Sequence, residues 1–396
     1  MSTISFANRI ATVEEYYFST KLAEVKKLDT PEKPIINLGI GSPDLAPAPE
    51  VVEALQKSSA LANNHGYQSY KGIPAFRNAI ASFYKDRYNV QLHADNEILP
   101  LVGSKEGIMH IAMAFVNEGD EILIPDPGYP TYAAVAKLTG GKIKTYDLTE
   151  ENNWQIDVKA LAKSDLAKVK IMWINTPHMP TGTTIPKSTM QSLVQLAKQH
   201  QFLLVNDNPY SFILNEQPTS LLSIDGATDV CLELNSLSKS HNMAGWRLGW
   251  VAGKKEFIDA ILKVKSNMDS GMFLPLQEAA VQALQLTSKW HDEVNKIYQI
   301  RKTKAETLLK KLGCNIQQPQ AGLFVWGKVP DAVKDVVEWI DDILYNTHVF
   351  ITPGFVFGKN GERYVRVSLC ASEQKFDEAQ HRIEAMLISK NEKVKA

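Results

Sequence analysis

The chain has 396 residues, which suits one large domain or two domains and is too long for a single small core. Its 43 Lys and Arg residues nearly balance 44 Asp and Glu residues, so the net charge is -1 and nothing in the charge pattern points to nucleic acid. Apolar residues make up 44% and charged residues 22%, which is ordinary for a soluble globular protein.

The cysteines and the N-terminus bear on the compartment. Cys231, Cys314 and Cys370 are odd in number and widely spaced, which predicts buried free thiols rather than a disulfide framework. The first ten residues lack a basic patch followed by an apolar core, and no apolar run reaches the roughly 18 residues of a membrane span. We therefore expect a cytoplasmic protein that does not enter the membrane.

The first forty residues read as an arm followed by a turn. Residues 1–34 are polar, with a helix expected over 18–28, and residues 35–41 form a short apolar segment. That segment ends in Gly-Ile-Gly41-Ser-Pro-Asp, where glycine lets a backbone approach a ligand closely. A plain turn linking two domains is the alternative for Gly41.

From residue 95 to residue 253 short apolar runs alternate with helical patterns, which predicts a mostly parallel sheet covered by helices on both faces. A helix with apolar residues on one face is expected over 187–200. Strands are expected at 98–102, 121–124, 142–146, 170–174, 202–205, 230–235 and 248–253.

A strand-to-helix turn, Gly103-Ser-Lys-Glu-Gly107, opens the first helix of this series. Free backbone N–H groups and the positive end of a helix attract phosphate. We therefore name Ser104 and Lys105 as phosphate contacts, mainly through their backbone. A glycine-rich turn alone is weak support, and its place in the chain strengthens it.

The stretch richest in chemistry is Ser236-Leu-Ser-Lys-Ser-His-Asn-Met-Ala-Gly-Trp-Arg-Leu-Gly249. A lysine amine that is kept neutral attacks carbonyls and forms a Schiff base, and Lys239 is the candidate. Ser236 and Ser238 offer hydroxyls beside it, and Arg247 offers a fork suited to phosphate. Together they suit an aldehyde that carries a phosphate, which describes pyridoxal phosphate. The alternative is a surface Lys and Arg in a glycine-containing turn.

The last third of the chain predicts a second, smaller α/β unit. Helical patterns over 276–312 lead to strands at 322–326 and 364–369 and a closing helix at 373–387. Alternation in the second strand puts Arg366 opposite the apolar face, free to point into a cleft. An arginine that faces solvent is the alternative.

The string Ser-Leu-Ser-Lys239, with eight residues from Lys239 to Arg247, resembles the cofactor-lysine motif of the class I/II pyridoxal-phosphate aminotransferases of fold type I. Landmarks of that family follow in order from Leu38 to Leu369. The resemblance implies a large α/β domain with a mostly parallel sheet and a smaller α/β domain. The boundaries we expect are 1–45 for the arm and part of the small domain, 46–285 for the large domain and 286–396 for the small C-terminal domain.

The resemblance also implies how pyridoxal 5′-phosphate is held. Asp207 would keep the pyridine nitrogen protonated, Tyr210 would meet the ring oxygen, and Tyr129 would stack on the ring. An Asx turn before a proline is the alternative for Asp207, and an ordinary core or surface tyrosine is the alternative for Tyr129. Asn175 opens the loop Asn-Thr-Pro-His-Met-Pro-Thr-Gly182, which is similar to a cofactor-contacting loop of the family.

This loop departs from the family at Met179, where an asparagine usually contacts the cofactor's phenolic oxygen and helps to hold the substrate carboxylate. A thioether is a weak acceptor and cannot donate. Either Asn175 or His178 supplies a substitute donor, or the site is tuned differently.

Substrate and partner residues are implied in the same way. Gly41 would meet the substrate carboxylate and Arg366 would grip it with two parallel hydrogen bonds. Tyr67 would reach the cofactor phosphate of the neighbouring subunit, which implies a homodimer with shared active sites. The aromatic residues Tyr16, Tyr17 and Phe18 of the arm would suit an apolar or aromatic amino donor.

These features predict an aminotransferase that moves an amino group from an L-amino acid to a 2-oxo acid, with Lys239 as Schiff-base lysine and proton shuttle. No metal is expected. The first alternative is a C–S lyase that runs β-elimination on the same fold, because the cofactor carries the reaction and the pocket selects it. The second is a non-catalytic regulator, although no residues are left for a DNA-binding segment.

Overall fold

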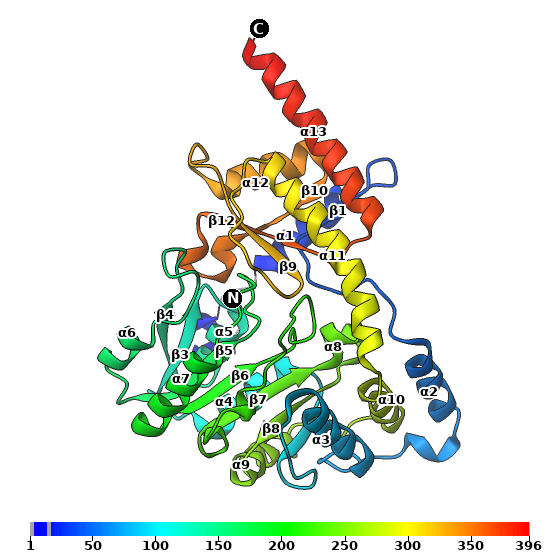
Figure 1. Cartoon of the computed structure of the whole chain (residues 1–396), viewed down its shortest axis with the longest axis vertical. Coiled ribbons are helices and arrows are strands. Elements are labelled where there is room, and N and C mark those ends of the chain that lie inside the picture. The colour runs from blue at the N-terminus through cyan, green and yellow to red at the C-terminus, as the bar shows by residue number, and fades with distance from the viewer. Residues whose placement is uncertain (1–3, 14–16, 396) are drawn as a thin grey trace.

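The computed structural model describes residues 4–13 and 17–395, which form a large unit and a smaller one (Figure 1). The large unit is built on a seven-stranded sheet in the order β2-β8-β7-β6-β5-β3-β4. Every neighbouring pair is parallel except those of β8, which is antiparallel to both β2 and β7. The strands are β2 (Ile98–Leu101), β3 (Glu121–Asp126), β4 (Lys142–Asp147), β5 (Val169–Asn175), β6 (Leu203–Asp207), β7 (Cys231–Ser236) and β8 (Gly249–Gly253).

Helices cover both faces of this sheet, and each face has its own apolar core. Residues at helical spacing on α4 (Ile108, Ile111, Ala112) pack against one face together with α5 and α9. On the other face, α3 and α7 pack against the sheet, α6 lies on α7, and α10 packs on α2 and α3. The helices are α2 (Pro49–Ser59), α3 (Pro74–Tyr88), α4 (Ser104–Phe115), α5 (Pro130–Leu138), α6 (Val158–Lys163), α7 (Lys187–His200), α8 (Leu237–Ser240), α9 (Lys255–Lys265) and α10 (Leu274–Leu284).

The smaller unit brings the two ends of the chain together. Strand β1 (Ile36–Asn37) pairs in parallel with β10 (Val349–Phe350). The second sheet of this unit is antiparallel, in the order β11-β12-β9. Figure 1 shows α11 running from the large unit to the small one. The remaining elements are α1 (Tyr17–Leu28), α11 (Ser288–Lys311), α12 (Val336–Thr347), α13 (Glu373–Lys395), β9 (Phe324–Lys328), β11 (Thr352–Pro353) and β12 (Tyr364–Ser368).

The predicted architecture is therefore confirmed: a mostly parallel sheet with helices on both faces, joined to a smaller α/β unit. The three cysteines are buried free thiols, as expected. The domain boundaries stay a prediction. Within the part of the chain described here, no helix is long and apolar enough to cross a membrane.

One expectation on the C-terminal third was wrong in detail. Helix α13 continues to Lys395, eight residues beyond the expected end, because Lys and Glu favour helix even without an apolar face. All five residues of β12 are buried, and Arg366 points into a cavity, as expected. The strand is central in its sheet, and the large unit covers the side from which Arg366 projects.

Candidate active site

A cavity of about 570 Å³ lies at the carboxyl ends of the parallel strands, where reactive groups gather in such sheets. Asn175 ends β5, Asp207 ends β6 and Ser236 ends β7. Every predicted site residue except Tyr67 lines this cavity; they are Gly41, Ser104, Lys105, Tyr129, Asn175, Asp207, Tyr210, Ser236, Ser238, Lys239, Arg247 and Arg366.

Tyr67 lies elsewhere on this chain. Its side chain is 92% exposed and does not contribute to the cavity wall. It belongs to a surface on which several large apolar residues are exposed. These residues are Leu61, Tyr67, Tyr70, Met268 and Phe273, and the two segments that carry them touch, since the rings of His65 and Phe273 lie 5.6 Å apart.

Lys239 is held on the four-residue helix α8, which the Ser236 hydroxyl caps by accepting from the Ser238 N–H at 3.1 Å. The Lys239 Nζ donates to the Gly41 carbonyl at 2.5 Å. Burial lowers the pKa of the Lys239 ammonium, and the nearby charges of Arg366 and Arg247 lower it further. A larger neutral fraction makes this amine a better nucleophile.

Asp207 is buried and lines the cavity, and its two carboxylate oxygens differ in their hydrogen bonding. Its Oδ2 accepts from the Tyr132 hydroxyl at 2.9 Å. Its Oδ1 is buried and has no hydrogen-bond partner among the described residues. Burial raises the pKa of the Asp207 carboxyl to about 6. A buried oxygen without a partner is costly, so this atom suits a ligand that donates an N–H.

The opposite end of the cavity is built for an anion. Gly103 has a φ of +85°, and a Cβ there would lie 2.1 Å from the Arg247 Nη2. Only glycine lets the guanidinium approach the start of α4, where the first backbone N–H groups have no partner within the helix. The Arg247 Nη1 donates to the Ala244 carbonyl at 2.9 Å and lies 3.4 Å from the Ser238 hydroxyl. A phosphate suits this cup of cation, hydroxyl and N–H groups.

Both ends of the Asn175 amide are already bonded to backbone. Its Oδ1 accepts from the Met179 N–H at 2.6 Å and its Nδ2 donates to the Asp207 carbonyl at 2.5 Å. The amide thus ties the end of β5 to β6 and to the loop. His178 does not line the cavity, and its Nδ1 lies 2.8 Å from the Thr181 hydroxyl. Burial lowers the pKa of His178 to about 3, so the ring is neutral near pH 7.

Arg366 reaches the cavity from the smaller unit. Its Nη2 donates to the Gly39 carbonyl at 2.7 Å, and its Nη1 lies 3.2 Å from the Met179 sulfur. The guanidinium carbon lies 4.0 Å from the ring centre of Phe324 and 4.6 Å from that of Phe357. This contact places a buried cation between aromatic rings and excludes the solvent-facing alternative.

The residues that sequence reasoning missed are mostly apolar. Leu22, Ile40, Phe324 and Phe357 form an apolar part of the cavity wall, and the last two lie against Arg366. Each follows an ordinary core pattern, so only the meeting of the two units identifies it as part of the site. Tyr132 was also missed, although it follows Tyr129 by three residues and therefore lies about one helical turn away.

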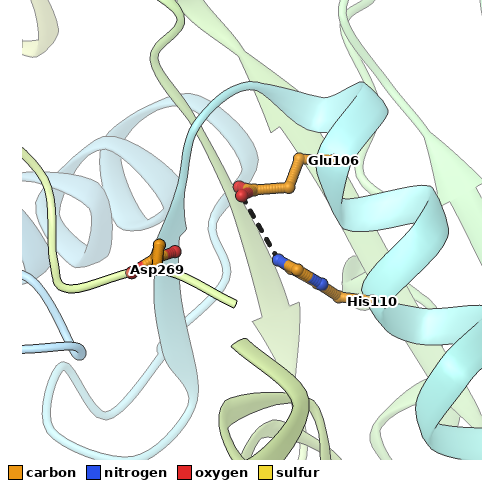
Figure 2. A group of neighbouring side chains, drawn as sticks. All are labelled: Glu106, His110 and Asp269. Carbon is orange, nitrogen blue, oxygen red and sulfur yellow. Dashed lines mark ion pairs between the residues drawn. The ribbon is translucent and has the colours of Figure 1, made fainter. Parts of the chain in front are cut away.

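A group of possible metal ligands lies outside the cavity (Figure 2): Glu106 and His110 on α4 and Asp269 on the loop after α9. The His110 Nε2 is 3.3 Å from Glu106, whose other oxygen accepts from the Val102 N–H at 2.6 Å. The ammonium of Lys265 lies 2.8 Å from Asp269 and already supplies a cation there. Glu106 holds the turn before α4 in place through its bond to the Val102 N–H.

The sequence pattern of the family "Aminotransferase class I and II" matches residues 33–383. The LL-diaminopimelate aminotransferases of Oleidesulfovibrio alaskensis and Aquifex aeolicus are each 38% identical, covering 98% and 96% of this chain and 100% and 98% of their own length. A substrate-bound structure of BacF from Bacillus subtilis superposes with a TM-score of 0.92 at 31% identity, covering 97% of this chain and 98% of that one.

The chain therefore belongs to the class I and II aminotransferase family. It is an aminotransferase, an enzyme that moves an amino group from an amino acid to a 2-oxo acid. The resemblance stated from the cofactor-lysine motif is confirmed.

Proposed function

We propose that the cavity binds pyridoxal 5′-phosphate and that Lys239 carries out amino-group transfer on it. The observation that carries the proposal is the arrangement of three unlike groups around one cavity: a lysine with a lowered pKa, a buried carboxylate with an unpartnered oxygen, and an anion cup. When bound, pyridoxal phosphate supplies the electron sink for the electrons released from the substrate Cα.

Each of these groups fits one part of the cofactor. The Asp207 Oδ1 would accept the pyridine N–H, which satisfies the orphaned oxygen. Ser104, Lys105, Ser238 and Arg247 would hold the phosphate. Ser236 would act through the cap that it gives to α8.

Two tyrosines and one asparagine complete the cofactor site in this proposal. Tyr129 would lie against the ring and the Tyr210 hydroxyl would donate to the ring oxygen, since both line the cavity. Asn175 would act by holding the Asp207 backbone in position, because both ends of its amide are bonded to backbone. His178 is not proposed as a substitute donor, since it lies outside the cavity wall.

Lys239 and Arg366 would act on the substrate. The neutral Lys239 amine would take the proton from the substrate Cα and return it as general acid. Arg366 would bind the α-carboxylate, and the rings of Phe324 and Phe357 fix its plane. The carboxylate would sit beside Gly41, where a Cβ would lie 2.4 Å from the Phe324 ring. These contacts orient the Cα–H bond for proton transfer.

We propose LL-diaminopimelate as the first amino donor to test, because relatives of that name align with nearly the whole chain. The apolar wall of Leu22, Ile40, Phe324 and Phe357 favours a second candidate, a donor with an apolar side chain. Of the arm aromatics, Tyr17 packs against Phe355 with ring centres 5.2 Å apart and does not line the cavity. Tyr16 and the Phe18 side chain lie outside the described residues.

We also propose a homodimer in which the surface around Tyr67 meets a second copy. The exposed apolar residues lie on segments 61–70 and 268–273, which touch, and such exposed apolar surface is typical of an interface. Tyr67 would then contribute its hydroxyl to the phosphate cup of the partner subunit.

An amino-donor panel tests the function. Purified protein with added pyridoxal phosphate is given LL-diaminopimelate, aspartate, leucine or phenylalanine with 2-oxoglutarate, and glutamate formation is followed. Glutamate formed from LL-diaminopimelate or an apolar donor supports the proposal, and turnover of aspartate alone would reject both donors. Pyruvate released from a cysteine conjugate without any acceptor would favour the C–S lyase instead.

A further inference from the structure

The Asp207 carboxylate depends on a single side-chain donor. Its Oδ2 receives the Tyr132 hydroxyl at 2.9 Å, and its Oδ1 has no partner among the described residues. The residue is only 5% exposed, so little of its side chain is open to solvent. A buried carboxylate with one donor is poorly stabilised in its charged form.

The Tyr132 ring is packed so that its hydroxyl points toward Asp207. It lies in the first turn of α5 and is 1% exposed. Its ring stacks on Trp173 with centres 5.0 Å apart and planes 7° apart, and it meets Tyr129 edge-on at 5.6 Å. A ring clamped on two sides keeps its hydroxyl on one line toward Asp207.

We propose that Tyr132 is a positioning residue whose hydroxyl keeps the Asp207 carboxylate charged and aims its second oxygen at the pyridine nitrogen of the cofactor. The inference rests on the proposed function. Burial raises the pKa of the Asp207 carboxyl to about 6, and the Tyr132 hydrogen bond opposes that rise. A protonated carboxyl could not hold the pyridine nitrogen in its cationic form, which is the form that accepts electrons.

Other ionisable groups line the same cavity, and none of them gives Asp207 a hydrogen bond among the described residues. They are Lys105, Tyr129, Tyr210, Lys239, Arg247 and Arg366. Burial has the largest effect on the pKa of Asp207, and the Tyr132 hydroxyl is the side-chain donor among the described residues that opposes it.

A matched pair of variants tests the inference. Tyr132→Phe removes only the hydroxyl that reaches Asp207. Tyr146→Phe removes another buried tyrosine hydroxyl, which donates to the Trp173 carbonyl at 2.9 Å and does not line the cavity. Both substitutions delete one buried hydrogen bond beside Trp173, so a purely structural cost would appear in both.

The readouts are the pH profile of kcat and the dissociation constant of pyridoxal phosphate. In Tyr132→Phe, kcat should fall and the dissociation constant of pyridoxal phosphate should rise, each by about tenfold near pH 6. This is the size expected for one hydrogen bond to a charged group. Because the pKa of Asp207 rises without its donor, the deficit should shrink as pH increases and the carboxyl ionises. Tyr146→Phe should stay within about twofold of the parent at every pH, even if both variants melt earlier.

The Tyr132→Phe substitution is also made in the Asp207→Asn variant, which gives a sharper test because the amide has no charge for Tyr132 to stabilise. There, Tyr132→Phe should change the dissociation constant of pyridoxal phosphate by less than about twofold. Parallel pH profiles for Tyr132→Phe and the parent, or an equal loss in Tyr146→Phe, would overturn the inference. A parent protein that neither binds pyridoxal phosphate nor transaminates would instead overturn the proposed function.

Discussion

Two buried carboxylates lie on neighbouring strands of the large sheet, and their surroundings differ. Glu233, in the middle of β7, is fully buried and receives four donors: the Tyr84 hydroxyl at 3.0 Å, the Ser220 hydroxyl at 2.8 Å, the Leu221 N–H at 2.7 Å and the Asn206 amide at 3.0 Å. Asp207, at the carboxyl end of β6, receives one side-chain donor and keeps one oxygen without a partner.

The difference separates a structural charge from a functional one. Four donors compensate Glu233 for the loss of water, so it ties α3, β6 and the loop at residues 220–221 into one body. Asp207 is left incomplete where the cavity opens. A buried polar atom that lacks a partner and belongs to a residue lining a cavity marks a place where a ligand can complete the hydrogen bonding.

The same comparison applies to two lysines, and here we expect the largest effect. In both Lys239 and Lys302 burial lowers the pKa, and each Nζ donates to a backbone carbonyl at 2.5 Å. Only Lys239 lines the cavity. Lys239→Ala should lower the transamination rate by about a thousandfold or more, as befits the loss of both nucleophile and proton shuttle.

Lys302→Ala is the matched control for this prediction. It should retain the parent rate within about threefold, since it removes a half-buried lysine that does not line the cavity. The rates are measured in single turnover with a saturating amino donor. Comparable losses in the two variants would mean that burial of a lysine, rather than its place in the cavity, explains the result.

The carboxylate pair itself gives the second prediction. Asp207→Asn should lower kcat by about a hundredfold, since the neutral amide does not stabilise a charged pyridine nitrogen. Near pH 7 the variant should be at least as stable as the parent, because the substitution removes a poorly satisfied buried charge. Glu233→Gln should keep its rate per folded molecule and lose about 1–3 kcal/mol of stability, because a bonded network is broken. Denaturant unfolding beside kinetics separates the two, and a reversed pattern would refute the assignment.

Most of the strands and site residues could be predicted from the sequence because their sequence signals are local. The runs at 98–101 and 203–207 are apolar and short, as strands covered on both faces must be. Lys239 and Arg247 were found because a short motif fixes their spacing. The exact amide geometry of Asn175 was not accessible, since its two backbone partners belong to a different strand and to the loop beyond it.

Contacts between distant segments could not be predicted. Arg366 and Met179 lie 187 residues apart in sequence, and their contact depends on how the smaller unit sits on the large one. Tyr132 follows ordinary helix spacing, and only the end of β6 beneath its hydroxyl gives it a partner. The burial of both faces of β12 likewise follows from the packing of two units, which alternation within one strand does not report.

The third prediction concerns stability against pH in protein freed of cofactor. The pKa of Asp207 is raised to about 6 by burial, above the ordinary value of about 3.9. Between these values the folded state binds a proton that the unfolded state does not, so this group's contribution to stability falls as pH rises from about 4 to 6 and is level above. The total change is about 3 kcal/mol.

Asp207→Asn removes this contribution. The unfolding free energy of each protein is measured by denaturant titration at several pH values. From pH 4 to pH 6 the parent should lose stability relative to the variant. A difference that stays constant from pH 4 to pH 8 would show that the carboxyl is not desolvated as described.

The smallest effect is expected on the substrate side. Arg366→Lys keeps the charge and loses the planar fork that lies between Phe324 and Phe357. The KM for the amino donor should rise by about tenfold, the cost of one charge-assisted hydrogen bond. The dissociation constant of pyridoxal phosphate should stay within about twofold, because Arg366 belongs to the substrate end of the cavity. Equal losses in both constants would place Arg366 with the cofactor instead.

The central claim is that Lys239 is the residue that bonds to the cofactor. It is tested most directly by treating the protein with pyridoxal phosphate, reducing with borohydride and mapping the labelled peptide by mass spectrometry. The account predicts one pyridoxyl group per chain, on Lys239, and its loss on prior incubation with an amino donor. A label on Lys105 or Lys302, or no label at all, would contradict it.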